Sequence, residues 1–203
     1  MEQQITKQRP FVNGQYEYLL VANPDEPVFN KVMGEKQAFY DRYKERVAIK
    51  TTPHITVASF LAMDSMEETV IRWIERICSR QRSFSVALNN FSGFPPHTIY
   101  LRVQNPQPFQ QLAKQLKVIS DYIKSSDGPM PTLVDRPYLT IARRLPEDVY
   151  SKAMLDYSHR DFHGSFMVNE LVLLRRKRQF DTCEKVMVFK FLPAEMDLFT
   201  ATA

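Results

Sequence analysis

The sequence contains little cysteine and little glycine, and it has no long apolar run. Two cysteines, Cys78 and Cys183, among 203 residues are too few for a disulfide scaffold. With only five glycines there is neither a GxGxxG nor a GxxxxGK[ST] pattern, which argues against classical dinucleotide and P-loop sites. No apolar run approaches the roughly 18 residues of a membrane-spanning helix. The first residues also lack the apolar stretch of a signal peptide. We therefore expect a cytoplasmic protein with no membrane partner.

The composition that remains is typical of a globular protein. Hydrophobic residues make up 44% of the chain and charged residues 25%, so a core can form without a metal or disulfide. No linker rich in glycine or serine divides the chain. We predict a single domain over 1–203, with 1–15 and 193–203 as peripheral tails. A net charge of +4 is compatible with an anionic partner but too weak to identify one.

Strand-like and helix-like segments alternate along the chain. Residues 84–88 and 98–103 are predicted to form a hairpin across 89–97, and Asp64 with Glu67 resembles a capping box. The order of elements indicates a mixed sheet with helices packed on it, an α+β class. The other predicted strands are 16–21, 54–61, 138–142, 166–174 and 185–191, and the predicted helices are 27–47, 66–77, 109–123 and 146–157.

One tetrad occurs twice. Residues 54–57 read HITV after Pro53, and residues 138–141 read YLTI after Pro137. Each tetrad is followed by alanine. Alternate side chains of a strand point to the same side, so the first and third residues of each tetrad share a face. Two such strands side by side would present four polar side chains to one cleft: His54, Thr56, Tyr138 and Thr140.

These tetrads resemble the paired His-x-Thr-x motifs of the 2H phosphoesterase superfamily, which includes 2'-5' RNA ligase-like proteins and cyclic phosphodiesterases. The order of elements is similar from about residue 16 to 191, and segments 94–100 and 140–144 also resemble this family. The resemblance implies a bilobal fold with two pseudo-symmetric antiparallel or mixed sheets, helices on the outside and a central cleft. It implies a site for RNA ends or small nucleotides that carry a 2',3'-cyclic phosphate or a 2'-5' linkage.

The chemistry of such a site needs a base that deprotonates water and an acid that protonates the leaving oxygen. Histidine suits both roles because its pKa is about 6.5, and threonine hydroxyls can donate to phosphate oxygens. No metal or other cofactor is needed. Tyr138 stands where the family has histidine, and a phenol is a poor base with no positive charge. We expect His54, Thr56 and Thr140 to bind phosphate, with weak or absent turnover.

Further side chains are candidates for binding the substrate. By strand alternation Arg144, rather than Arg143, shares the face of Thr140. Tyr100 and Phe94 could stack on a base or pack in the core. His97 could approach the cleft or fix a loop.

Other polar groups have plainer interpretations. The basic run 175–178 is either a solvated hairpin turn or a surface that attracts RNA. His159 and His163 have a spacing that would suit a metal on a helix, but we expect a loop there.

Three hypotheses for the function stay open. The first is a metal-independent cyclic phosphodiesterase related to 2'-5' RNA ligases, acting as a monomer on RNA ends or nucleotides. The second is a non-catalytic nucleotide- or RNA-binding module of the same fold. The third is a protein-interaction scaffold with a vestigial cleft.

Overall fold

A computed structural model describes residues 14–126, 129–177 and 181–194 of the chain. Within these ranges there are four α-helices, one short 3-10 helix and nine strands. The helices are α1 (Glu26–Tyr43), the 3-10 helix η1 (Asp64–Met66), α2 (Glu67–Cys78), α3 (Gln107–Ser125) and α4 (Glu147–Tyr157). The strands are β1 (Gln15–Ala22), β2 (Ile55–Met63), β3 (Phe84–Phe94), β4 (Thr98–Val103), β5 (Thr132–Leu133), β6 (Tyr138–Arg143), β7 (His163–Val168), β8 (Glu170–Arg176) and β9 (Glu184–Lys190).

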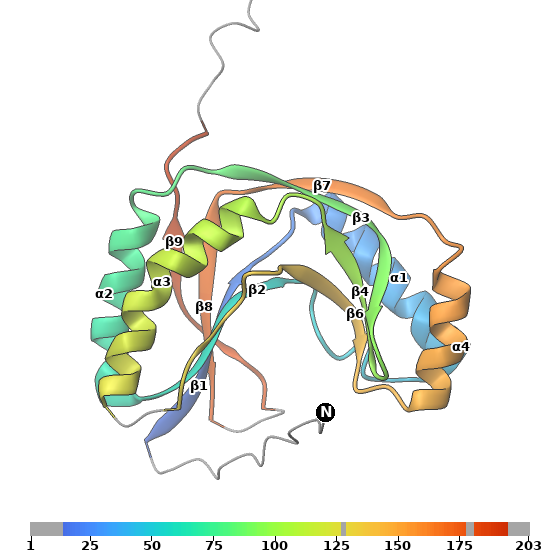
Figure 1. The fold of residues 1–203 in the computed structure, drawn as a ribbon, viewed down its shortest axis with the longest axis horizontal. Helices are drawn as coiled ribbons and strands as arrows, with labels where there is room; N and C mark the ends of the chain where they lie inside the picture. Colours follow the sequence, from blue (N-terminus) through green and yellow to red (C-terminus); the bar gives the residue numbers. More distant parts are fainter. Residues whose placement is uncertain (1–13, 127–128, 178–180, 195–203) are drawn as a thin grey trace, which may run out of the picture.

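The described strands form one sheet that curves into an arch (Figure 1). Their order is β7-β3-β4-β6-β2-β1-β8-β9, with β5 also paired to β2, and every pair of strands is antiparallel. The arch has a seam at its middle, where β2 and β6 are joined by the single register pair Ile55–Leu139. The predicted α+β architecture is confirmed, and the two predicted sheets are the two halves of one continuous sheet, which meet at this seam.

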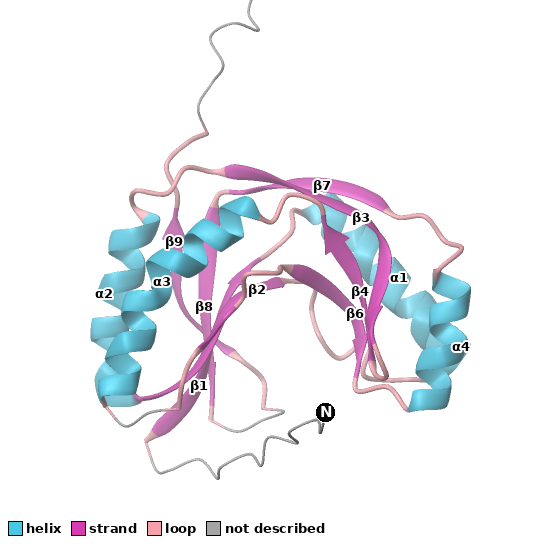
Figure 2. Cartoon of the chain, in the orientation of Figure 1, coloured by secondary structure: helices cyan, strands magenta, loops and turns pink. Residues whose placement is uncertain are grey.

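The helices lie outside the arch, two at each end (Figure 2). At one end α3 packs on β2 and β5, and α2 packs on α3 and β9. At the other end α1 packs on β6 and β7, and α4 packs on β3 and β4. Each half of the molecule therefore consists of the strands on one side of the β2–β6 seam together with one pair of helices. No helix in the described ranges is long and apolar enough to cross a membrane.

The helix ends follow local chemistry. The Asp25 carboxylate accepts a hydrogen bond of 3.1 Å from the backbone N–H of Val28 and so begins α1. The helix was predicted to reach residue 47 but ends at Tyr43, because Lys44 adopts a left-handed conformation with φ 59°. The predicted helix over 109–123 is confirmed as part of α3, whose apolar face is buried.

Two local predictions are wrong. The predicted strand 166–174 breaks at Asn169 into β7 and β8. These two strands lie in opposite halves of the sheet, where β7 pairs with β3 and β8 pairs with β1. The predicted capping box does not form: Asp64 starts the 3-10 helix η1, and its carboxylate accepts from the next residue, Ser65.

The predicted hairpin of β3 and β4 is confirmed, but β3 extends to Phe94 and leaves only three residues between the strands. Asn90 is an extra residue in this strand, with φ 53°, so pairing with β4 resumes beyond it. Of the predicted tails, 1–13 and 195–203 lie outside the described residues.

Candidate functional site

The two tetrads lie side by side at the seam of the arch. Ile55 and Leu139, the paired residues of β2 and β6, are fully buried against the core. Counting outward in antiparallel register places His54 opposite Thr140 and Thr56 opposite Tyr138. The side chains on the face away from the core are all partly exposed: His54, Thr56, Tyr138 and Thr140.

Both tetrad strands contain a β-bulge at the same point. On β2, Thr56 pairs with Val21 and Ala58 with Leu20, so Val57 is an extra residue. On β6, Ile141 is the corresponding extra residue. A bulge shifts the alternation of side chains by one position. The burial patterns show this shift, because two successive buried residues follow the threonine in each strand.

The shifted alternation changes which residues return to the exposed face. Beyond the bulges these are Ser59 on β2 and Arg143 on β6. The prediction of Arg144 rested on uninterrupted alternation, which does not hold past Ile141. Arg144 follows the end of β6 with φ 57°, whereas the charge of Arg143 acts directly on His54 and Lys36. The structure therefore makes Arg143 the cationic side chain next to the tetrads.

His54 has a defined hydrogen-bonding state. Its Nδ1 lies 2.9 Å from the carbonyl oxygen of Thr52. Because a carbonyl only accepts, Nδ1 carries the hydrogen and Nε2 keeps its lone pair in the neutral ring. Burial lowers the pKa of His54, as do the positive charges of Arg143 and Lys36, against the opposing effect of the Thr52 bond. The ring is therefore neutral near pH 7 and is a base at Nε2.

Lys36 lies beneath the exposed face, on the core side of β6. It is 1% exposed, and its ammonium donates to Thr51 Oγ1 at 3.2 Å and to the carbonyls of Thr140 and Ile141 at 3.2 and 3.0 Å. Burial and the charge of Arg143 lower its pKa to about 8. Sequence reasoning missed this residue, although the sequence carried a signal: Lys36 stands one turn after Val32 on the apolar stripe of α1.

Three aromatic rings from neighbouring strands gather beside Thr140. Phe94 and Tyr100 stack with centroids 4.4 Å apart, and each lies 5.1 Å from the Tyr138 ring. Tyr100 pairs with Thr140 across β4 and β6, and Phe94 is 41% exposed. We call Phe94, Tyr100 and Tyr138 the aromatic cluster. Tyr138 belongs both to this cluster and to the face of the tetrads.

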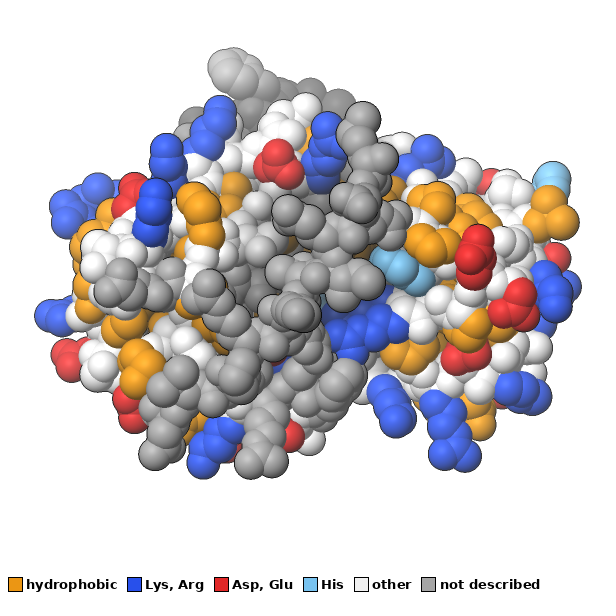
Figure 3. All heavy atoms as spheres, turned by 60° about the horizontal axis from the view of Figure 1, so that its bottom comes forward, with side chains coloured by type: hydrophobic (Ala, Val, Ile, Leu, Met, Phe, Trp, Pro, Cys, Tyr) orange, Lys and Arg blue, Asp and Glu red, His pale blue; other side chains and the backbone are white. Residues whose placement is uncertain are grey.

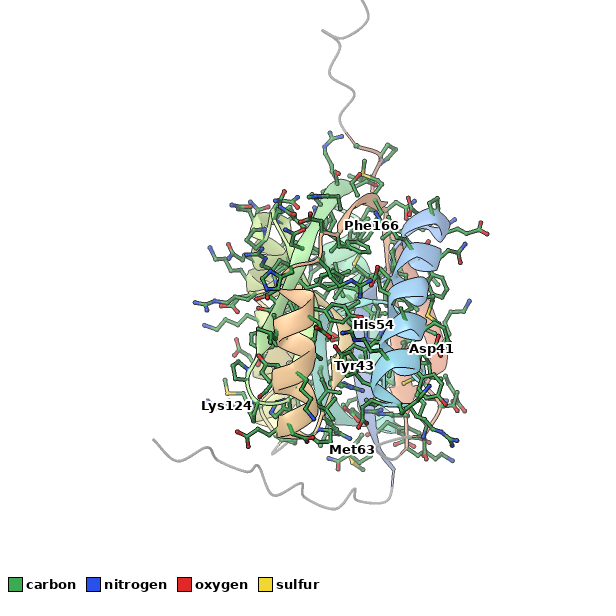
Figure 4. The ribbon with its side chains drawn as sticks, turned by 90° about the vertical axis from the view of Figure 1, so that its right-hand side faces the viewer. Asp41, Tyr43, His54, Met63, Lys124 and Phe166 are labelled. Atoms are coloured by element: carbon green, nitrogen blue, oxygen red, sulfur yellow. The ribbon has the colours of Figure 1, made fainter. Side chains whose placement is uncertain are left out.

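Two views show the surface of the arch and the position of His54. Figure 3, which looks toward the open side of the arch, shows a histidine ring and several Lys or Arg side chains at the surface near the middle of that face. Figure 4 labels His54 at mid-height and Met63, the last residue of β2, at the lower edge. In this view His54, just before β2, therefore lies away from the edge at which β2 ends.

The family model described as the 2'-5' RNA ligase superfamily matches residues 24–180, a span that contains both tetrads. The chain belongs to this superfamily. The resemblance to 2H phosphoesterases drawn from the tetrads is confirmed. A comparison with curated proteins gives no match.

Solved structures of this superfamily's fold are similar over nearly their whole length. Escherichia coli LigT complexed with 3'-AMP has a TM-score of 0.63 at 15% identity, covering 87% of this chain and 98% of LigT. The protein TT0787 of Thermus thermophilus also has a TM-score of 0.63, at 14% identity, covering 88% of this chain and 100% of its own. At such identities the likeness establishes the fold and not the substrate.

The remaining predicted groups have structural partners. His97 contacts Thr98 Oγ1 through Nδ1 at 3.1 Å, and its carbonyl accepts from Leu145 N–H. These contacts fix the turn between β3 and β4. Of the basic run, Arg175 is paired with Glu67 and Arg176 with Glu17, and position 178 lies outside the described residues.

The predicted loop at the two remaining histidines is partly confirmed. His159 lies in the turn after α4, whereas His163 begins β7. Among the described residues, no group of three His, Cys, Asp or Glu side chains could hold a metal ion.

Proposed function

We propose that this 2'-5' RNA ligase superfamily protein binds RNA ends or nucleotides that carry a 2',3'-cyclic phosphate or a 2'-5' linkage, and that it hydrolyses the cyclic phosphate slowly. The observation that supports this most strongly is the seam between β2 and β6. The two tetrads meet there with matching bulges, which brings one imidazole, one phenol, two hydroxyls and one guanidinium to the same face.

The proposed reaction follows from the protonation states. His54 Nε2 takes a proton from water as the water oxygen attacks phosphorus. The bond from phosphorus to one ribose oxygen breaks, and the Tyr138 hydroxyl donates its proton to that oxygen. The hydroxyls of Thr56 and Thr140 donate to the non-bridging oxygens, and Arg143 offsets the charge that develops there. The proton is then returned from His54 to the phenolate through water, which restores both groups.

Tyr138 is the reason for expecting slow turnover. A phenol, with an ordinary pKa near 10, is a weaker proton donor than an imidazolium at neutral pH. It also brings no positive charge to the phosphate. The half of the site that contains Tyr138 can therefore bind the anion but assists departure of the leaving group poorly.

The aromatic cluster gives the proposed site a place for a base. Exposed aromatic rings stack on nucleobases in many single-stranded RNA sites. Tyr100 pairs with Thr140, and the exposed ring of Phe94 stacks on Tyr100. The structures of Escherichia coli LigT with 3'-AMP and with phosphate support a nucleotide ligand for this fold.

The test measures hydrolysis of adenosine 2',3'-cyclic monophosphate and, separately, binding of 3'-AMP. We expect the wild-type protein to bind 3'-AMP and to hydrolyse the cyclic substrate slowly. The His54→Ala variant should lose hydrolysis while its melting temperature is unchanged. A folded wild-type protein that binds neither nucleotide nor phosphate would overturn the proposal.

The substitution at Tyr138 supports a second candidate, a non-catalytic nucleotide- or RNA-binding module. This alternative predicts the same binding of 3'-AMP with no hydrolysis above background. It also predicts equal, background rates for the wild-type protein and His54→Ala.

A further inference from the structure

We propose that Lys36 is a positioning residue for the phosphate site: its buried ammonium holds the bulge of β6 and adds positive charge beneath Thr140 and Arg143. This inference rests on the proposed function and concerns the same face. Lys36 is not proposed to touch the substrate, because its ammonium is directed to backbone and hydroxyl oxygens below that face.

The first argument is the free-energy cost of this ammonium. All three of its acceptors are uncharged oxygens, and the side chain is almost completely buried. A buried charge is expensive unless it is paired, and apolar residues of similar volume often replace buried charges without loss of stability. The flanking residues of the stripe, Val32 and Phe39, are apolar and fully buried. A cation at this position therefore departs from the local pattern, as residues at functional sites often do.

The second argument comes from the matching bulge on β2. There the carbonyl of Val57 accepts a hydrogen bond of 2.9 Å from the backbone N–H of Val134. A neutral donor is sufficient to hold that bulge. The corresponding carbonyl of Ile141 accepts from an ammonium instead. The bulge geometry alone does not require the charge.

The third argument is where the charge is placed. Lys36 serves the half of the site that has Tyr138 in place of a histidine. Its charge acts together with that of Arg143 on His54, and the two cations also repel each other, which adds to the effect of burial in lowering the pKa of Lys36. An anion bound at Thr140 would relieve that repulsion. Lys36 and Arg143 thus supply the positive potential that a phenol lacks.

The test uses Lys36→Gln, which keeps a hydrogen-bond donor and removes the charge. Lys31→Gln is the matched control: Lys31 lies on the same helix, is exposed, and donates to the carbonyl of His163. Calorimetry measures binding of inorganic phosphate and of 3'-AMP, and NMR measures the pKa of the His54 ring. We expect Lys36→Gln to bind both ligands about tenfold more weakly and to raise the His54 pKa, with Lys31→Gln unchanged in both.

A purely structural role for Lys36 predicts a different result. A folded Lys36→Gln protein with wild-type phosphate affinity and an unchanged His54 pKa would overturn the inference. If the wild-type protein itself binds neither phosphate nor 3'-AMP, the proposed function fails as well, and the two failures are distinguishable.

A measurement on the wild-type protein covers the case in which Lys36→Gln does not fold. Because coupling between two binding events is reciprocal, a charge that strengthens phosphate binding tenfold must have its own pKa raised by about one unit when phosphate is bound. NMR of the Lys36 side chain, in a protein labelled at lysine, reads this directly. The charge of Arg143 on β6 acts on Lys36, and the charge of Lys36 acts in turn on His54, just before β2. No change in the Lys36 titration at saturating phosphate would overturn the inference.

Discussion

The two halves of the seam have the same backbone design and different chemistry. In each, a partly exposed residue and a threonine are followed by an extra residue and a buried alanine. In the β2 half the partly exposed residue is His54, which lies just before the strand, and Ser59 is the next residue to reach the exposed face. On β6 the corresponding residues are Tyr138 and Arg143. The repeat preserves where side chains point, while the imidazole lies in one half and the cationic side chains of Arg143 and Lys36 contact the other.

The two bulges also differ in the donor that holds their carbonyl oxygens. The β2 bulge is held by a backbone N–H and the β6 bulge by an ammonium. The comparison teaches that the two halves of a pseudo-symmetric fold can keep the same backbone bulge while carrying different side chains and different support. Four predictions test how unequal the halves are, from the largest expected effect to the smallest.

His54→Tyr makes both halves alike by placing a phenol in each. We expect hydrolysis of adenosine 2',3'-cyclic monophosphate to fall by about 10³-fold, because a general base contributes on the order of 10²–10⁴-fold. The rate is compared with that of the wild-type protein at equal fraction folded. An activity within threefold of wild type would mean that His54 is not the base.

Lys36→Met removes the buried one of the two cations in the β6 half and tests the free-energy cost of burying it. In the unfolded chain Lys36 loses its proton at the ordinary lysine pKa of 10.5, whereas in the folded chain its pKa is about 8. Between these values the unfolded state binds more protons, so the wild-type free energy of unfolding rises with pH. Across this pH range, the free energy of unfolding of the wild-type protein should rise by about 3 kcal/mol more than that of Lys36→Met.

Urea unfolding of both proteins at several pH values between 8 and 10.5 checks this prediction. Because the comparison is between two otherwise identical chains, the titrations of other groups cancel. Parallel curves would show that Lys36 has the same pKa in the folded and unfolded states.

Tyr138→His makes the halves alike in the opposite way, by restoring the imidazole that the family pattern contains. The expected result is an increase in kcat of between about 10- and 10²-fold, because a proton donor of suitable pKa is placed at the leaving oxygen. Steady-state hydrolysis of a 2',3'-cyclic nucleotide measures it. A folded variant that binds 3'-AMP but gains no rate would contradict the role given to Tyr138.

Arg143→Asn and Arg144→Asn form a matched pair that tests the shifted alternation on β6. Asparagine tolerates the left-handed conformation of position 144. Loss of a charge-assisted contact predicts about tenfold weaker phosphate binding for Arg143→Asn. Less than a twofold change is expected for Arg144→Asn. Calorimetry with inorganic phosphate measures both, and the reverse order would favour uninterrupted alternation.

Much of the fold was accessible from local patterns. The helix over 109–123 was predictable because its apolar residues recur at helical spacing, and the tetrad strands because both repeat β-branched residues after proline. The break at Asn169 was not, since the short polar pair Asn169-Glu170 does not by itself end a strand and only pairing with distant strands separates β7 from β8.

The tetrad residues of the candidate site could be predicted from the sequence, whereas the neighbouring cations Arg143 and Lys36 could not. The repeat singled out His54, Thr56, Tyr138 and Thr140, and the structure places these four on one partly exposed face. Arg143 was missed because strict alternation of side chains does not allow for a bulge. The apolar doublets Val57-Ala58 and Ile141-Ala142 are the sequence feature that indicates a bulge in each strand. Lys36 was missed because its acceptors on β6 lie more than a hundred residues away.

The most direct test of the account is a crystal structure of the protein with bound inorganic phosphate. The account predicts a phosphate at the seam, within hydrogen-bonding distance of the hydroxyls of Thr56 and Thr140 and facing His54 Nε2. A phosphate bound elsewhere with the seam empty, for example at Arg76 and Arg80 beside the pocket between α2 and α3, would contradict it.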